Sequence, residues 1–202
     1  MSKKRTSIIK RKTRETDITV KLNIDGSGKT KIDTGIGLLD HMLELFAFHG
    51  LFDLDINAKG DLKVDIHHTN EDIGIVLGEA FKKALGKKES IKRFGSSSVP
   101  MEEVVANVAI DISGRGNFII SLPKPLLAIS PEKGYEFKDV EHFFEALAKH
   151  LGMNMNIKID PVSRDLHTTL EPAFKALGLA LEQAVSIDPR RKGVPSTKGV
   201  ID

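Results

Sequence analysis

The sequence contains no cysteine and no tryptophan, has a single tyrosine, and carries nearly balanced charge. Without cysteine there can be no disulfide bond, thiolate ligand or iron–sulfur cluster, so any bound metal must be held by histidine, aspartate or glutamate. The net charge of +2 gives no general attraction to nucleic acid or to a membrane surface. No apolar run reaches the length of a membrane span, and none follows the basic Met1–Arg5 segment as a secretory signal requires. We therefore expect a cytoplasmic protein without nucleic-acid or membrane partners.

A motif of histidine and carboxylate residues occurs twice in the chain. The first copy reads HHTNE from His67, and the second reads HTTLE from His167. Another histidine precedes each copy at a similar distance, since His41 lies 26 positions before His67 and His142 lies 25 positions before His167. Imidazole and carboxylate together suit borderline divalent metals. A duplicated fold with a duplicated set of metal ligands is therefore the hypothesis to test.

The hydrophobic pattern also occurs twice in the same order, in a chain of 202 residues that is long enough for one large or two small domains. Alternation typical of strands occupies residues 16–24, 29–33, 51–58 and 62–66 in the first half, and 104–112, 117–122 and 153–159 in the second. Helical spacing occupies residues 37–49, about 69–85, 140–151 and roughly 166–185. A serine turn follows Gly95, and a segment rich in proline and lysine occupies residues 123–138. We predict an α+β fold of two repeats, 1–95 and 96–202, each a small antiparallel sheet with two helices on one face.

Helix geometry decides which motif residues can share a metal. Residues three or four apart lie on one helical face, so Glu71 can face the same side as His67 or His68, and Glu171 the same side as His167. Adjacent residues diverge by about 100°, so His67 and His68 most easily serve two different metals. The alternative is that these are polar residues at helix N-termini, where acidic groups are favoured. Five of the seven histidines fall into the repeated pattern, and this favours the metal interpretation.

A second group of residues indicates anion binding. Its basic members lie in or beside short stretches that contain glycine or serine: Arg93, Arg115, Lys175, Lys192 and Lys198. Arginine and lysine side chains near exposed backbone amides are how proteins hold a phosphate. Because 30 of the 202 residues are lysine or arginine, solvated surface charge is the better explanation for any single one of them.

The order of short motifs along the chain resembles the imidazoleglycerol-phosphate dehydratases of histidine biosynthesis, from about residue 11 to residue 200. The motifs that carry the resemblance are RET at 14–16, DTGI at 33–36, LDHML at 39–43, HGLFDL at 49–54, DIHHTNED at 65–72, RFG at 93–95, DISGR at 111–115, EHFF at 141–144, Glu171 with FKA at 174–176, and PSTKGV at 195–200. So long an ordered series is specific. The resemblance implies a duplicated fold like domain 2 of ribosomal protein S5, and a shell of 24 subunits built from trimers.

The resemblance also implies an activity and a set of site residues. The activity is dehydration of D-erythro-imidazole glycerol phosphate to imidazole acetol phosphate through an imidazolate-like intermediate, with two Mn²⁺ ions per active site at subunit interfaces. The implied metal ligands are His41, His67, His68, Glu71, His142, His167 and Glu171. The implied catalytic residues are Glu15, as the general acid–base group, with His41, His68, Glu71 and His167. The implied substrate-binding residues are Glu15, Arg93, Arg115, Lys175, Ser196 and Lys198, the last two in a C-terminal phosphate-binding tail.

Three positions depart from the family pattern. Thr168 stands where the family has the second histidine of the second pair, Ile66 stands where aspartate precedes the first pair, and Leu45 stands where glutamine is common. A threonine hydroxyl is a weak neutral oxygen in place of an imidazole nitrogen, so one metal site has lost a ligand. We expect water or the substrate ring to fill this position, because a catalytic metal needs open positions.

Two other classes of protein are alternatives to a metal-dependent dehydratase. A shell protein of this family that binds metal without turnover is the main alternative, and Thr168 is its best support. A di-iron carboxylate protein is disfavoured, because such a protein has Glu-x-x-His pairs in a helical bundle, whereas strands are plentiful here.

The two-fold repeat also predicts how the ligands divide between two metals. If the repeats exchange the two metals, one site holds His41, His68, Glu71 and His167, and the other holds His67, His142, Glu171 and whatever replaces an imidazole at position 168.

Overall fold

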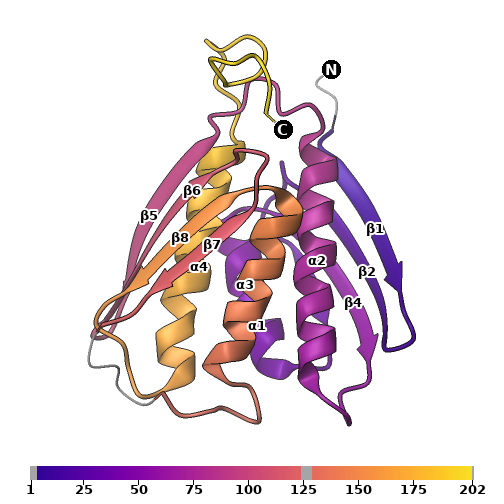
Figure 1. Ribbon diagram of the computed structural model, residues 1–202, viewed down its shortest axis with the longest axis vertical. Coiled ribbons are helices and arrows are strands. Elements are labelled where there is room, and N and C mark those ends of the chain that lie inside the picture. Colours follow the sequence, from indigo (N-terminus) through magenta and orange to yellow (C-terminus); the bar gives the residue numbers. More distant parts are fainter. Residues whose placement is uncertain (1–3, 124–128, 202) are drawn as a thin grey trace.

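Helices fill the space between two sheets in the computed structural model, which describes residues 4–123 and 129–201 (Figure 1). The first half contains β1 (Thr6–Lys12), β2 (Thr16–Asn23), β3 (Thr30–Asp33), α1 (Gly37–His49), β4 (Asp53–Gly60) and α2 (Ile66–Leu85). The second half contains β5 (Phe94–Met101), β6 (Val104–Asp111), β7 (Asn117–Ser121), α3 (Phe137–Leu151), β8 (Asn154–Ile159) and α4 (Leu166–Val185). Among the helices of this described part, none has the length and hydrophobicity needed to cross a membrane.

The two halves have the same topology, so the predicted α+β duplication is confirmed. The strand order is β1-β2-β4-β3 in one sheet and β5-β6-β8-β7 in the other. The expectation of purely antiparallel sheets is wrong, because β3 pairs with β4 in parallel and β7 pairs with β8 in parallel. The cause is the connection: α1 joins β3 to β4, and α3 joins β7 to β8, and a helical crossover returns the chain in the same direction.

Alternating apolar residues place one face of each sheet against the helices. Ile18 and Val20 of β2 are fully buried and lie opposite Ala58 and Ile56 of β4. The second sheet repeats this arrangement, with Val108 of β6 opposite Ile157 of β8. Burial of this apolar surface is the main stabilising contribution to each half.

Glycines let the helices of one half approach those of the other half closely. Helix α2 packs against α3, and α1 packs against α4 (Figure 1). A Cβ atom on Gly74 of α2 would lie 2.7 Å from the Phe143 carbonyl oxygen of α3. A Cβ atom on Gly178 of α4 would lie 2.4 Å from the Phe46 carbonyl oxygen of α1. Because these helices cross so closely, polar residues on a helix of one half lie near polar residues on a helix of the other half.

Local predictions fail where tertiary contacts or caps decide the structure. Residues 62–64 form a turn instead of part of a strand, and α2 begins at Ile66 because the Asp65 carboxylate accepts a hydrogen bond of 2.9 Å from the His67 backbone N–H. The predicted serine turn is part of β5, and β1 was not predicted. β5 is an edge strand, where Pro100 is tolerated. Within the segment predicted at 123–138, residues 124–128 lie outside the described part, and α3 begins at Phe137.

Candidate metal centre

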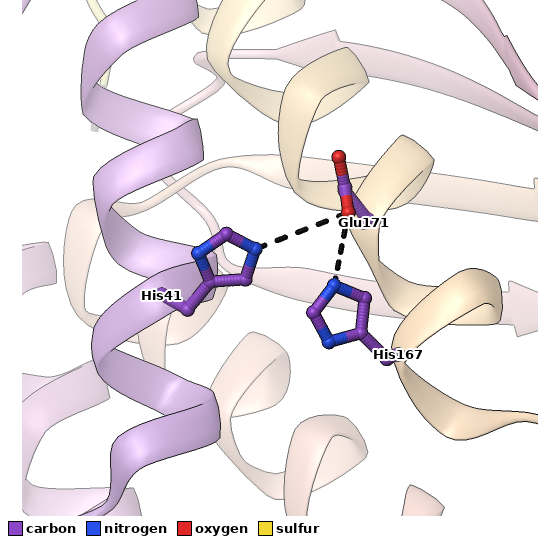
Figure 2. A group of neighbouring side chains, drawn as sticks. All are labelled: His41, His167 and Glu171. Atoms are coloured by element: carbon purple, nitrogen blue, oxygen red, sulfur yellow. Dashed lines mark hydrogen bonds and ion pairs between the residues drawn. The ribbon is translucent and has the colours of Figure 1, made fainter.

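The first cluster lies between α1 and α4, where the two halves meet. Figure 2 shows His41 of α1 facing His167 and Glu171 of α4. The Glu171 Oε2 atom lies 3.0 Å from His167 Nε2 and 3.9 Å from His41 Nε2. The two imidazole rings are stacked with centroids 4.9 Å apart. One potential ligand atom from each residue lies within 4.8 Å of the others, so two nitrogens and one oxygen could share a cation.

The carboxylate of this cluster is held in its charged form. Lys175 lies one helical turn after Glu171, and its Nζ is 2.5 Å from Glu171 Oε1. Burial alone would raise the pKa of Glu171, but the hydrogen bond from Lys175 and the charges of Lys175 and His167 together lower that pKa. A carboxylate that stays ionised is a better metal ligand than a neutral acid.

The second cluster lies between α2 and α3. His67 and Glu71 come from the first turns of α2, and His142 comes from α3. The Nδ1 atoms of His67 and His142 are 3.0 Å apart, and His67 Nε2 lies 3.4 Å from Glu71 Oε2. A cavity of about 180 Å³ opens beside these three residues. The side chain of Glu71 is 49% exposed and that of His41 is 41% exposed, so both clusters are accessible from outside the chain.

His68 belongs to a third group, which contains a carboxylate that the sequence motifs did not identify. His68 Nδ1 lies 3.1 Å from Asp61 Oδ2 and 3.9 Å from Glu15 Oε2. The hydrogen bond with Asp61 raises the pKa of His68. Asp61 meets Glu15 because β2 and β4 are paired so that Thr16 lies opposite Gly60. The contact between Asp61 and Glu15 could be predicted only from the register of β2 and β4, which the sequence motifs do not give.

Within one chain, the site residues are therefore grouped differently from the predicted partition. Glu171 lies with His41 and His167, while Glu71 lies with the other two histidines of the α2–α3 cluster. His68 is engaged by Asp61. The partition remains a prediction for an assembly, in which neighbouring chains can supply ligands to the same metal.

The predicted anion-binding residues divide into anchored and exposed groups. Arg93 donates through Nε and one terminal nitrogen to both oxygens of Asp111, at 2.6 and 3.0 Å, and through the other to the Pro195 carbonyl oxygen at 3.0 Å. The Asp111 carboxylate raises the pKa of Arg93. This arginine consequently holds the C-terminal tail in place, and the Lys198 backbone N–H donates to Ser196 Oγ at 3.2 Å within that tail. Arg115, Lys192 and Lys198 are exposed.

His49 is a further polar residue near the first cluster that was not among the predicted site residues. Burial lowers the pKa of His49, and the positive charge of Lys175 lowers it further, while Glu171 opposes this effect. His49 lies on the same face of α1 as His41, with Leu45 between them at helical spacing. The sequence signal that could have identified His49 was its position, eight residues after His41 and four after Leu45 on one helical face.

Two similar α+β halves, whose paired helices bring imidazole and carboxylate groups together, define a duplicated protein with candidate metal sites. The family model for imidazoleglycerol-phosphate dehydratase matches residues 34–181. The imidazoleglycerol-phosphate dehydratase of Thermoanaerobacter pseudethanolicus is 53% identical over 193 residues, which cover 96% of this chain and 97% of that protein. The protein of the same name from Methanocella arvoryzae is 51% identical over 198 residues, covering 98% of this chain and all of that protein.

Solved structures show the same similarity. The crystal structure of the Pyrococcus furiosus dehydratase in complex with (S)-C348 matches with a TM-score of 0.80 at 36% identity, covering 95% of this chain and 99% of that chain. The Staphylococcus aureus dehydratase matches with a TM-score of 0.74 at 32% identity, covering 90% of this chain and all of that chain. The chain belongs to the imidazoleglycerol-phosphate dehydratase family.

Proposed function

We propose that this chain dehydrates imidazole glycerol phosphate to imidazole acetol phosphate in histidine biosynthesis, as a hydro-lyase of the cytoplasm. Membership of the dehydratase family across nearly the whole chain supports the reaction and the phosphate substrate. The observation that carries the proposal to this chain's own residues is the cluster of His41, His167 and Glu171, which brings metal-ligating atoms from both halves within 4.8 Å.

The residues of the clusters fit a divalent cation of the Mn²⁺ type. Their donors are imidazole nitrogens and carboxylate oxygens, and this mixture suits borderline divalent metals. Within one chain, His41, His167 and Glu171 form one group and His67, Glu71 and His142 another. In the assembly, neighbouring subunits combine such groups into two sites per active site, one with His41, His68, Glu71 and His167 and the other with His67, His142 and Glu171. When bound, such a cation supplies positive charge that stabilises an imidazolate-like form of the substrate ring.

Glu15 is assigned to proton transfer. The hydrogen lost from the carbon beside the ring is not acidic, so a side chain must take that proton and return one to the departing hydroxyl group. The Glu15 carboxylate is 54% exposed and lies 3.9 Å from His68 Nδ1, so a ring held beside His68 comes within its reach. The backbone of Asp61 donates a hydrogen bond of 3.1 Å to the Glu15 carbonyl oxygen and fixes where this side chain starts.

The basic residues are assigned to the phosphate group of the substrate. Lys175 stands beside the first cluster, and its ammonium group can hold a phosphate oxygen while still paired with Glu171. Arg115, Ser196 and Lys198 supply further donors from exposed segments, while Arg93 orders the tail that carries the last two. The exposure of Arg115 and Lys198, together with the exposure of both clusters, supports completion of each site between subunits. We propose a shell of 24 subunits assembled from trimers.

A metal-binding shell protein without turnover is the second candidate, and Thr168 is the observation that favours it. The Thr168 backbone N–H donates to the Asp165 carboxylate at 2.7 Å, so the residue contributes to the cap of α4 whether or not it faces a metal. The retention of Glu15 and of the basic residues favours the enzyme, because a shell alone needs neither.

A crystal structure loaded with manganese and an unreactive imidazole or triazole phosphate tests the proposal. We expect anomalous manganese peaks at the histidine–carboxylate clusters, ring nitrogens of the ligand facing those peaks, and its phosphate near Lys175 and the tail. Manganese peaks elsewhere, or a ring bound away from Glu15, would contradict the assignment. The same maps test the ligand partition, which is wrong if the better-occupied metal does not contain His68 and Glu71.

A further inference from the structure

Two carboxylates outside the predicted ligand set lie against the Nδ1 side of site histidines. Asp61 Oδ2 is 3.1 Å from His68 Nδ1, and Glu132 Oε2 is 4.0 Å from His167 Nδ1. Within the part of the chain that the structure describes, three buried side-chain oxygens have no hydrogen-bond partner, and two of them are Asp61 Oδ1 and Glu132 Oε2. A buried carboxylate oxygen without a partner is costly, so a further role is expected for Glu132, whose unpartnered Oε2 is the atom that faces His167. At Asp61 the unpartnered atom is Oδ1, and the support for a role is the 3.1 Å contact of Oδ2 with His68.

Backbone contacts hold Glu132 where it is. The N–H groups of Glu132 and Tyr135 each donate to the carbonyl oxygen of the other at 2.9 Å, across Lys133 and Gly134, which both have positive φ. Two central residues with positive φ define a type I′ turn, a rigid short connection. The buried Tyr135 hydroxyl donates to Asn70 of α2 at 2.7 Å and ties the turn to the other half.

Hydrogen bonds also fix the backbone of Asp61, which directly follows β4. Its backbone N–H donates to the Glu15 carbonyl oxygen at 3.1 Å, and its own carbonyl oxygen accepts from the Val64 N–H at 2.7 Å. The side chain therefore reaches His68 from a fixed turn. The backbone positions of Asp61 and Glu132 are thus set by hydrogen bonds that do not involve either histidine.

The opposite edge of the His167 ring faces the cluster. His167 Nε2 lies 3.0 Å from Glu171 Oε2, and the His41 atom that approaches the same oxygen is also Nε2. In a neutral imidazole one nitrogen carries the proton and the other offers a lone pair. A carboxylate at Nδ1 keeps the proton there, which leaves the lone pair of Nε2 for a metal.

We infer that Asp61 and Glu132 are positioning residues, which fix the proton of His68 and His167 on Nδ1 so that Nε2 of each ring is presented to the metal. The inference rests on the proposed metal-dependent function. At Glu132 it requires only a closer approach of about 1 Å, to reach the 2.7–3.2 Å of an N–H···O hydrogen bond.

A double-mutant cycle on manganese affinity tests this inference, with isothermal titration of Mn²⁺ into the metal-free full-length protein. Glu132→Gln should weaken Mn²⁺ binding by about 10- to 100-fold, as the loss of an outer-shell partner does. In a His167→Ala background the same substitution should change affinity by less than roughly twofold, because the residue through which it acts is gone. Asp61→Asn should behave in the same way with His68→Ala.

Matched controls separate positioning from general damage. Glu103→Gln changes an exposed carboxylate between β5 and β6, and Asp55→Asn changes a carboxylate that pairs with Lys21 at 2.9 Å on the other face of the first sheet. Neither control should alter Mn²⁺ affinity. Equal losses with and without the histidine, or no loss for Glu132→Gln and Asp61→Asn, would overturn the inference. Wild-type protein that binds no Mn²⁺ at all would instead overturn the proposed function on which it rests.

The manganese-loaded crystal structure decides the matter if the histidine variants bind too weakly for titration. Nε2 of His167 and His68 facing the metal, with Nδ1 on Glu132 and Asp61, supports the inference. Nδ1 bound to the metal, or either carboxylate coordinated directly, overturns it.

Discussion

Replacing Thr168 with histidine tests whether the second repeat is aligned correctly with the first. Thr168 is half-buried in the first turn of α4, one residue after His167. Adjacent residues on a helix diverge by about 100°, so a histidine here would point away from His167 and lie on the side of Glu171, three residues later, with which the predicted partition groups it. The backbone N–H of residue 168 would still donate to the Asp165 carboxylate and cap the helix, because this hydrogen bond of 2.7 Å does not involve the side chain of residue 168.

The expected gain in metal affinity exceeds the expected change in stability. An added direct ligand should tighten the weaker metal at least as much as an outer-shell partner does, about 10- to 100-fold. This factor corresponds to about 1.4–2.7 kcal/mol of binding free energy. The Thr168 hydroxyl also interacts with Asp165 and helps to lower the pKa of that carboxyl. Loss of this one hydrogen bond should cost only about 1 kcal/mol of unfolding free energy.

Metal retention and metal demand are the measurements. Thr168→His should keep more manganese during dialysis against chelator, and should lower the manganese concentration needed for half-maximal activity. Thr168→Gln is the control, because it adds a polar side chain of similar size without an imidazole. If the histidine variant leaves retention and half-maximal concentration unchanged, position 168 does not face a metal and the alignment of the second repeat is wrong.

Three further substitutions or deletions probe the other assignments. Glu15→Gln should lower turnover by roughly 10²-fold or more while metal content and assembly stay unchanged, and near-normal turnover would show that Glu15 is misassigned. Ending the chain at Gly193 removes Lys198, so the Michaelis constant should rise and depend less on salt; an unchanged constant would make the tail ordinary solvated surface. Asp165→Ala should lower the unfolding free energy of the metal-free protein by about 1 kcal/mol in urea denaturation, because the Thr168 N–H loses its cap. An unchanged transition midpoint would argue against that cap.

The duplicated architecture was predictable because its causes are local. Apolar alternation in β2 and β6, and helical spacing in α1 and α4, each place one face of an element in the core. Strand direction was not predictable in this way, since alternation looks the same in both directions. β5 was missed because serine and proline are poor strand formers. Tertiary packing decides here: a Cβ on Gly95 would lie 1.9 Å from the Ala180 carbonyl oxygen of α4, so the strand runs directly over the helix backbone.

For the candidate site, too, the sequence pattern could not predict which residues meet in space. The repeated motif identified the histidines and glutamates, but spacing alone could not say that His41 would meet His167 while His67 met His142. That pairing depends on which helices cross, and the crossings depend on glycines in α2 and α4. Asp61 and Glu132 belong to no repeated motif, because a strand end and a type I′ turn bring them to the histidines.

The central claim is that this chain is a working metal-dependent dehydratase although it has threonine at position 168. Its most direct test is the conversion of imidazole glycerol phosphate by purified, chelator-treated protein, measured as imidazole acetol phosphate formed with and without added Mn²⁺. We predict that product forms only after Mn²⁺ is restored. A folded, assembled and manganese-loaded protein that forms no product would contradict the claim and favour the shell protein without turnover.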